Sequence, residues 1–189
     1  MTENEEIAAL LDRLTRLHGA QGRMAGLPDA QVSALGYLAR ANRFSRMPSA
    51  VAEYLATTRG TASQTLLALA RKGLVEDAPA PGDRRSRIYS LTPAGRVVAR
   101  AETPTGTGDG PAAPRDGDDR CEAEGPRIRD GLRLALAAML RRTGGRTFGL
   151  CRTCRHHRSG EGDGGYCALL GVPLAPEEAD QICADHAFA

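Results

Sequence analysis

Four cysteines near the carboxyl end of this 189-residue chain are the residues whose types and spacing most clearly suggest chemistry. They are Cys151, Cys154, Cys167 and Cys183, in the pattern C-x2-C-x12-C-x15-C. Where the compartment keeps thiols reduced, a C-x2-C pair with two further cysteines indicates a metal or cluster site rather than disulfides. We expect such a compartment, the cytoplasm, because the sequence has neither a signal peptide nor a membrane-spanning run. Four thiolates are a complete ligand set for tetrahedral zinc or for an iron–sulfur cluster.

The spacing leaves the identity of the metal open. Zinc ribbons usually carry a second close pair, and only Cys183 with His186 could supply one here, so His186 is an alternative ligand. The tail is also similar to small cysteine motifs that hold 4Fe–4S clusters. The sequence therefore favours an iron–sulfur cluster (4Fe–4S or 2Fe–2S) slightly over Zn²⁺, with a thiol/disulfide switch behind both. We expect His156 and His157 to be solvated or to lie behind the ligands, and Cys121 to be an exposed thiol without function.

The elements that would position this site begin upstream, where residues 48–101 have the pattern of two helices, a two-stranded ribbon and a third helix. Ser49 is a candidate cap of the first helix. Thr61 and Gln64 have the spacing of a capping box for the second, and Gly73 supplies a left-handed stop after it. Thr92 and Pro93 are expected to cap and start the third helix. The inner stripe predicted for the second helix is Leu66, Leu67, Leu69 and Ala70.

Small hydrogen-bonding groups follow the other face of the second helix, and three arginines lie near the tip of the ribbon. Such groups near a positive helix end can contact phosphates and base edges in a major groove. Guanidinium groups on a hairpin suit a phosphate track or an A·T-rich minor groove. The predicted DNA contacts are Ser63, Gln64 and Thr65 at base edges, Thr61 and Arg59 at phosphates, and Arg84, Arg85 and Arg87 on the wing.

The charge distribution agrees with this assignment. Residues 40–100 hold 11 Arg or Lys against 4 Asp or Glu, whereas residues 101–126 hold 2 against 7. The positive charge is therefore concentrated where nucleic acid would bind.

Residues 27–101 resemble the winged helix-turn-helix domain of the MarR family of bacterial transcriptional regulators. The resemblance rests on three motifs, Lys72-Gly73-Leu74-Val75, Asp83-Arg84-Arg85 and Leu91-Thr92-Pro93-Ala94-Gly95. It implies a mainly α, α+β winged fold and a homodimer formed by the flanking helices. It also implies binding to a pseudo-palindromic operator in double-stranded DNA, usually as a repressor. The cysteine-rich tail and the long linker before the last helix depart from the common family pattern.

The sequence thus predicts five parts. Residues 1–26 carry an amphipathic dimerisation helix, residues 27–101 form the DNA-binding domain, and residues 102–126 are a flexible acidic linker. Residues 127–147 carry a second amphipathic dimerisation helix, and residues 148–189 form the cysteine-rich tail.

The predicted function is a DNA-binding regulator whose four-cysteine site senses redox state or iron. Loss of the cluster would shift the helix in residues 127–147 and so change the separation of the two recognition helices. That separation must stay at about 34 Å for both helices to reach successive major grooves. The alternative is a MarR-type regulator of a small-molecule response in which the tail binds a structural zinc. An enzyme is disfavoured because no His-x-Glu precedes the Cys-x2-Cys pair and no Ser/His/Asp or phosphate-loop pattern occurs. A zinc-stiffened tail that docks another protein is a further possibility.

Overall fold

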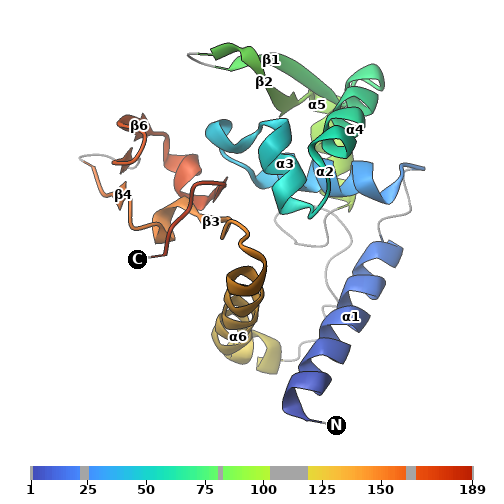
Figure 1. Ribbon diagram of the computed structural model, residues 1–189, viewed down its shortest axis with the longest axis vertical. Coiled ribbons are helices and arrows are strands. Elements are labelled where there is room, and N and C mark those ends of the chain that lie inside the picture. The colour runs from blue at the N-terminus through green and yellow to red at the C-terminus, as the bar shows by residue number, and fades with distance from the viewer. Residues whose placement is uncertain (1, 22–25, 81–82, 103–118, 161–164, 189) are drawn as a thin grey trace.

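The computed structural model describes residues 2–21, 26–80, 83–102, 119–160 and 165–188. It contains a winged helix-turn-helix unit, two long flanking helices and a small cysteine-rich lobe (Figure 1). The winged unit consists of α2 (Asp29–Arg40), η1 (Arg43–Ser45), α3 (Pro48–Tyr54), α4 (Arg59–Arg71), β1 (Val75–Ala80), β2 (Asp83–Leu91) and α5 (Pro93–Glu102). This is the α+β winged fold that the sequence predicts, so that prediction is confirmed.

The core of the winged unit is built around α2. Its Leu35, Tyr37 and Leu38 are at most 1% exposed, and α2 packs against both α4 and α5. Leu66 and Leu69 of α4 are fully buried, because residues three apart lie on the same side of a helix. Each buried leucine contributes roughly 2 kcal/mol, so this cluster accounts for much of the stability of the unit.

The two helices of the helix-turn-helix begin before the caps that the sequence predicts. Pro48, rather than Ser49, starts α3, where its missing N–H costs nothing because first-turn N–H groups have no helical partner. Thr58 caps α4, since its Oγ1 accepts the Thr61 N–H at 3.1 Å. The predicted box of Thr61 and Gln64 is therefore wrong, and Thr61 already lies within the first turn.

The wing is an antiparallel hairpin in which Val75 pairs with Leu91 and Pro79 pairs with Arg87. It is connected to the helices at both ends by the turn chemistry that the sequence predicts. Gly73, at φ +69°, ends α4, and Thr92 caps α5 by accepting the N–H of Gly95 at 3.0 Å.

Gly95 explains the end of the Leu-Thr-Pro-Ala-Gly motif. A Cβ at this position would collide with the backbone carbonyl of Leu74, so only glycine lets α5 approach the strand this closely. Thr92 strengthens the junction, because its hydroxyl donates to the Gly73 carbonyl at 2.7 Å. The motif therefore fixes the angle between the wing and α5.

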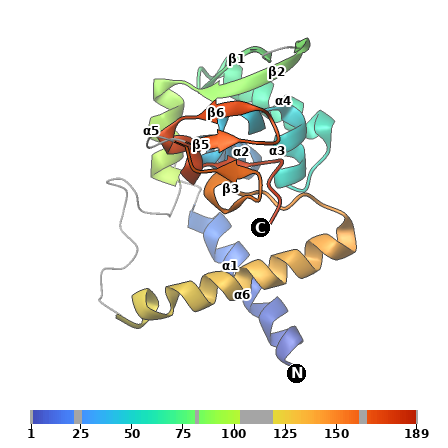
Figure 2. The same ribbon diagram turned by 90° about the vertical axis from the view of Figure 1, so that its left-hand side faces the viewer.

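Two long helices, α1 (Glu3–Gln21) and α6 (Asp119–Thr143), extend from the winged unit on the side away from the wing (Figures 1 and 2). Both expose large apolar side chains, which are Ile7, Leu10, Leu14 and Leu17 on α1 and Ile128, Leu132, Leu136 and Met139 on α6. Among the described residues, none of the helices combines the length and the apolar character that crossing a bilayer requires.

The helix α6 begins at Asp119, inside the segment predicted to be linker up to residue 126. Acidic residues follow at positions 122 and 124, and negative charge is favourable at the start of a helix. The spacing of apolar residues by itself does not indicate that the helix begins as early as Asp119. The remaining linker, residues 103–118, lies outside the described residues, and so does the side chain of Cys121.

The cysteine lobe, residues 147–160 and 165–188, is made of very short elements. They are β3 (Gly149–Leu150), η2 (Cys151–Thr153), β4 (His157–Arg158), β5 (Gly165–Cys167), β6 (Val172–Leu174), η3 (Pro176–Asp180) and β7 (Ile182–Cys183). β3 pairs with β7, and β4, β5 and β6 form a three-stranded sheet. The lobe lies beside α3 and η1 of the winged unit (Figure 1) and is joined to it by a bridge between Ala41 and Ile182.

Candidate nucleic-acid interface and cysteine lobe

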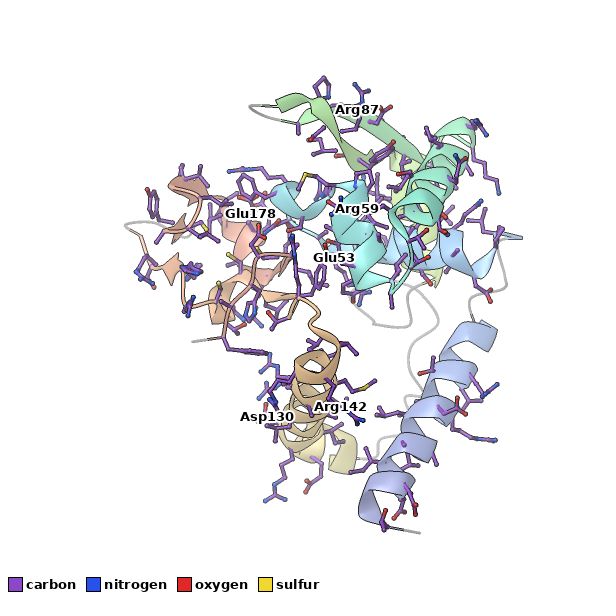
Figure 3. The ribbon with its side chains drawn as sticks, viewed as in Figure 1. Glu53, Arg59, Arg87, Asp130, Arg142 and Glu178 are labelled. Atoms are coloured by element: carbon purple, nitrogen blue, oxygen red, sulfur yellow. The ribbon has the colours of Figure 1, made fainter. Side chains whose placement is uncertain are left out.

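The outer face of α4 carries the polar residues that the sequence assigns to DNA. Arg59 starts the helix and is exposed at the turn that follows α3 (Figure 3), where the partial positive charge of the helix end adds to its own. Gln64 and Thr61 are exposed, while Ser63 and Thr65 are half-buried. Of the three residues predicted to contact base edges, Gln64 thus has the most accessible side chain.

Two further residues share this face and were not predicted as contacts. Leu67 is 40% exposed, so its assignment to the inner stripe is wrong. Arg71 is exposed as well. Both follow from the helical period, because residues 64, 67 and 71 lie three and four apart and therefore share one side of α4 with Gln64. This spacing is visible in the sequence, but Leu67 was assigned to the inner stripe because it lies between Leu66 and Leu69.

The wing presents its predicted arginines unequally. Arg87 lies on β2 (Figure 3), where its Nε donates to the Asp77 carboxylate of β1 at 2.6 Å and its Nη2 is ion-paired with the same group. This pair lowers the net charge that Arg87 can offer to phosphate. The side chains of Arg84 and Arg85 lie outside the described part of the chain, so their predicted contacts remain predictions.

The cysteine lobe brings its four cysteines together. All four are free and only 4–9% exposed. Burial raises the pKa of the Cys151 thiol, and the neighbouring Cys183, Cys167 and Cys154 add to the effect because negative charges on nearby sulfurs would repel one another, which together with burial brings the pKa to about 11. Residues separated by up to 32 positions in the chain thus surround Cys151.

One of these sulfurs accepts a hydrogen bond, since the N–H of Ala187 donates to the Cys154 sulfur at 3.4 Å. Burial raises the pKa of Cys183, while the nearby backbone of Asp185 and the side chains of Asn42 and Ser45 lower it by a smaller amount. Donors of this kind stabilise a thiolate, which is the form that binds metal.

The fit to a metal is incomplete in the arrangement described. Among the described residues, no three His, Cys, Asp or Glu side chains are placed so that they could hold one ion together. The donor chemistry of the four cysteines nevertheless suits zinc or an iron–sulfur cluster.

His186, the alternative ligand, is a buried residue with both ring nitrogens engaged. Nδ1 lies 3.1 Å from the hydroxyl of Thr147, and Nε2 lies 3.1 Å from that of Thr153. Burial lowers its pKa and favours the neutral ring. In contrast, Nε2 of His157 is buried without a hydrogen-bond partner among the described residues. The spacing from Cys183 singled out His186 in the sequence, but it did not indicate that Nε2 of His157 would be buried without a partner.

This fold is similar to that of known proteins. Residues 25–86 match the model of the MarR family, whereas no curated protein matches the chain. A mutant of MepR from S. aureus is 19% identical, with a TM-score of 0.50, and the match covers 74% of this chain and 99% of that one. The S. aureus MepR–DNA complex is 18% identical, with a TM-score of 0.49 and the same coverage. Apo wild-type MarR from E. coli is 23% identical, with a TM-score of 0.45, and the match covers 52% of this chain and 71% of that one.

The matched family segment includes α2, α3, α4, β1 and the start of β2. The resemblance stated from the sequence is therefore confirmed for this part of the chain. The cysteine lobe lies outside the matched segment.

Proposed function

We propose that this chain, whose residues 25–86 are a MarR-family segment, is a sequence-specific DNA-binding transcriptional regulator and not an enzyme. The observation that carries the proposal is the exposed polar face of α4 beside an arginine-bearing wing, on a unit of the MarR fold. Gln64 would contact base edges, and Arg59 would contact phosphates. A regulator of this kind acts on DNA in the cytoplasm, and the family resemblance makes repression the expected direction.

The regulator would act as a homodimer on a pseudo-palindromic operator. The support comes from α1 and α6, which expose apolar side chains at helical spacing on the side away from the wing. Covering these stripes in a dimer would remove them from water and would set two α4 helices about 34 Å apart, one per half-site. Light scattering of the full chain at micromolar concentration should give twice the 20.0 kDa chain mass.

DNA binding is tested with operators selected from random-sequence duplexes and with fluorescence anisotropy measured over a range of salt concentrations. Arg84→Ala and Arg85→Ala should each weaken binding to all sequences and lower the salt slope by about one. Arg87→Ala should do less, because Asp77 already neutralises this residue. Gln64→Ala should relax the sequence preference at one position, with a loss of about 1–3 kcal/mol in discrimination.

The matched control is Arg16→Ala, since Arg16 lies on α1 in an exposed pair with Asp12. It should leave both affinity and salt slope unchanged. If the control and the wing variants behave alike, the wing is not part of the interface. If the wild type selects no sequence from the random pool, the proposal of a sequence-specific regulator fails.

We also propose that the cysteine lobe binds a metal through Cys151, Cys154, Cys167 and Cys183, with an iron–sulfur cluster slightly ahead of zinc, and that this site senses iron or redox state. The support is the burial of Cys151 together with the other three cysteines and the Ala187 N–H that donates to the Cys154 sulfur. A zinc-loaded lobe would instead be structural, and the signal would then be a small molecule bound elsewhere.

The test is metal and sulfide analysis with an absorption spectrum of the full chain purified without oxygen. Absorbance at about 400 nm with stoichiometric iron and sulfide supports the iron–sulfur cluster. One zinc per chain in a colourless protein supports the structural zinc. Cys151→Ser should abolish binding of either. Cys121→Ser is the matched control and should retain it, because Cys121 lies outside the lobe. Wild-type protein without stoichiometric metal after reconstitution with either would contradict the proposal.

A further inference from the structure

The cysteine lobe contacts the winged unit at Arg43, the first residue of η1. Its Nη2 donates to the carbonyl of Pro173, on β6, at 3.0 Å, and its Nη1 lies 3.3 Å from the carboxylate of Glu178, on η3. The guanidinium also lies 4.6 Å from the centroid of the Phe44 ring, which packs against the buried cluster of the lobe. Two elements of the lobe thus bind one side chain of the DNA-binding unit.

Glu178 lies where the lobe faces the winged unit (Figure 3), and its side chain is only 5% exposed. Its Oε2 also accepts the N–H of Ala175 at 2.8 Å. A buried carboxylate is costly unless a cation and hydrogen-bond donors accompany it. Among the described residues, Arg43 is the cation that forms an ion pair with this carboxylate, so the conformation of Arg43 and the burial of Glu178 depend on each other.

The chain on both sides of Arg43 is also bonded to the lobe. The N–H of Asn42 donates to the Ile182 carbonyl at 2.9 Å, and the N–H of Ala184 donates to the Ser45 hydroxyl at 2.8 Å. Asn42 and Ser45 are each 1% exposed, and polar groups buried this deeply are normally held by specific partners. The lobe therefore fixes the position of η1 through these hydrogen bonds as well as through Arg43.

The η1 segment in turn supports the wing. The N–H of Tyr89, on β2, donates to the Arg46 carbonyl at 3.0 Å, so the edge of β2 that faces away from β1 rests on the residue that follows η1. The hydroxyl of Tyr37, on α2, donates to the Ser45 carbonyl at 2.6 Å. A shift of η1 would therefore move the base of the wing relative to α2.

We infer that Arg43 is a positioning residue for the wing. Pro173 and Glu178 of the lobe hold its guanidinium, and η1 supports β2 at Tyr89. This role rests on the proposed DNA-binding function and requires no metal in the lobe. It makes the lobe a structural part of the DNA-binding unit, so that loosening of the lobe is transmitted to the wing. The competing role for Arg43 is direct contact with a phosphate, because 50% of its side chain is exposed.

The first test is hydrogen exchange of individual backbone amides in the full, reduced, metal-free chain. Arg43→Ala should accelerate exchange at Tyr89 by about tenfold, because local opening at the base of the wing becomes easier, and should leave the core amide of Leu66 unchanged. The matched control is Arg152→Ala, which removes the exposed ion pair of Arg152 with Asp180 inside the lobe and should leave Tyr89 unchanged. No acceleration at Tyr89, or equal acceleration at Leu66 or in the control, overturns the positioning role.

A double-mutant cycle with Glu178→Gln separates this ion pair from a general effect of losing Arg43. Gln keeps an oxygen that can accept the Ala175 N–H but removes the charge, so Glu178→Gln alone should also accelerate exchange at Tyr89, by a smaller factor than Arg43→Ala. In the double variant no buried carboxylate is left without its cation, so exchange should be no faster than in Arg43→Ala alone. Additive effects would show that the two residues act independently and would contradict the positioning role.

The second test is fluorescence anisotropy with a duplex selected by the wild-type chain. Glu178→Gln removes a negative charge and keeps every cation, so electrostatics alone would tighten binding. We expect weaker binding instead, by about threefold to tenfold for both Glu178→Gln and Arg43→Ala, because the wing is misplaced in both. Weaker binding by Arg43→Ala alone, with a salt slope lowered by about one, would assign Arg43 to a phosphate contact and overturn the positioning role. Unchanged affinity in both variants also contradicts it.

Failure of the proposed function is distinguishable from failure of this role. If the wild-type chain selects no duplex, sequence-specific DNA binding fails, while exchange at Tyr89 still decides whether Arg43 positions the wing.

Discussion

The winged unit and the cysteine lobe are stabilised in different ways. The winged unit has a continuous apolar core from six of its elements, with Leu35, Leu66 and Leu69 fully buried. The buried cluster of the lobe consists of Cys151, Cys167 and Leu174, with Phe44 of the winged unit packed against it. The lobe therefore lacks the apolar area that a segment of its size needs to fold alone.

This difference shows how the lobe can be responsive while the winged unit remains folded. A domain with a large core unfolds as a whole, whereas a segment with a small core opens locally at lower free energy. The structure of the lobe depends on hydrogen bonds, on η1 and on the state of its thiols. Substitutions in each region test this contrast.

Leu66→Ala should lower the free energy of unfolding of the whole chain by about 3–5 kcal/mol, because it leaves a cavity in the core of α4. Chemical denaturation followed by circular dichroism measures the change. Leu67→Ala, one residue away on the exposed face, is the control and should cost less than about 1 kcal/mol. Similar losses for both would mean that α4 is not packed as described.

Leu174→Ala should destabilise the lobe by about 2–3 kcal/mol and leave the winged unit folded. The local effect appears as faster reaction of the buried thiols with a thiol reagent, while the circular dichroism midpoint moves little. Leu170→Ala, at an exposed position of the same lobe, should not change thiol reactivity. Joint unfolding of both regions would instead show that they form one cooperative unit.

Tyr37→Phe should cost about 1–2 kcal/mol, because the Ser45 carbonyl loses a buried donor. Burial raises the pKa of Tyr37 well above its usual range, so the hydroxyl stays protonated in the native state. In the unfolded chain the same hydroxyl ionises at about pH 10. The stability from this group is present below that pH and is lost as the pH rises above it. The variant should therefore lose less stability than the wild type between about pH 10 and 11, whereas the exposed Tyr166→Phe should follow the wild type.

Thr58→Ala should have the smallest effect, about 1 kcal/mol, through loss of the cap of α4. Gln64→Ala is the informative comparison, because the sequence assigned Gln64 to the cap and the structure places it on the exposed face. It should leave the thermal midpoint unchanged. A larger loss for Gln64→Ala than for Thr58→Ala would restore the predicted capping box.

Elements that depend on neighbours along the chain could be predicted from the sequence. Helical periods, the stop at Gly73 and the cap at Thr92 are local, because their hydrogen bonds join residues a few positions apart. The winged fold and the outer position of Gln64 follow from them. The spacing of the four cysteines also predicted that they belong to one site, and a metal at that site stays a prediction.

The meeting of distant segments depends on tertiary packing. No local signal indicates that Asn42 and Ser45 would bond to residues 182–184, that Asp77 would neutralise Arg87 on the wing, or that the lobe would dock on η1 rather than follow α6. These contacts depend on packing and on partners far apart in the chain, which periodicity cannot report. The residues that carry the chemistry were thus visible in the sequence, and the path that links them to the DNA-binding unit became visible only in three dimensions.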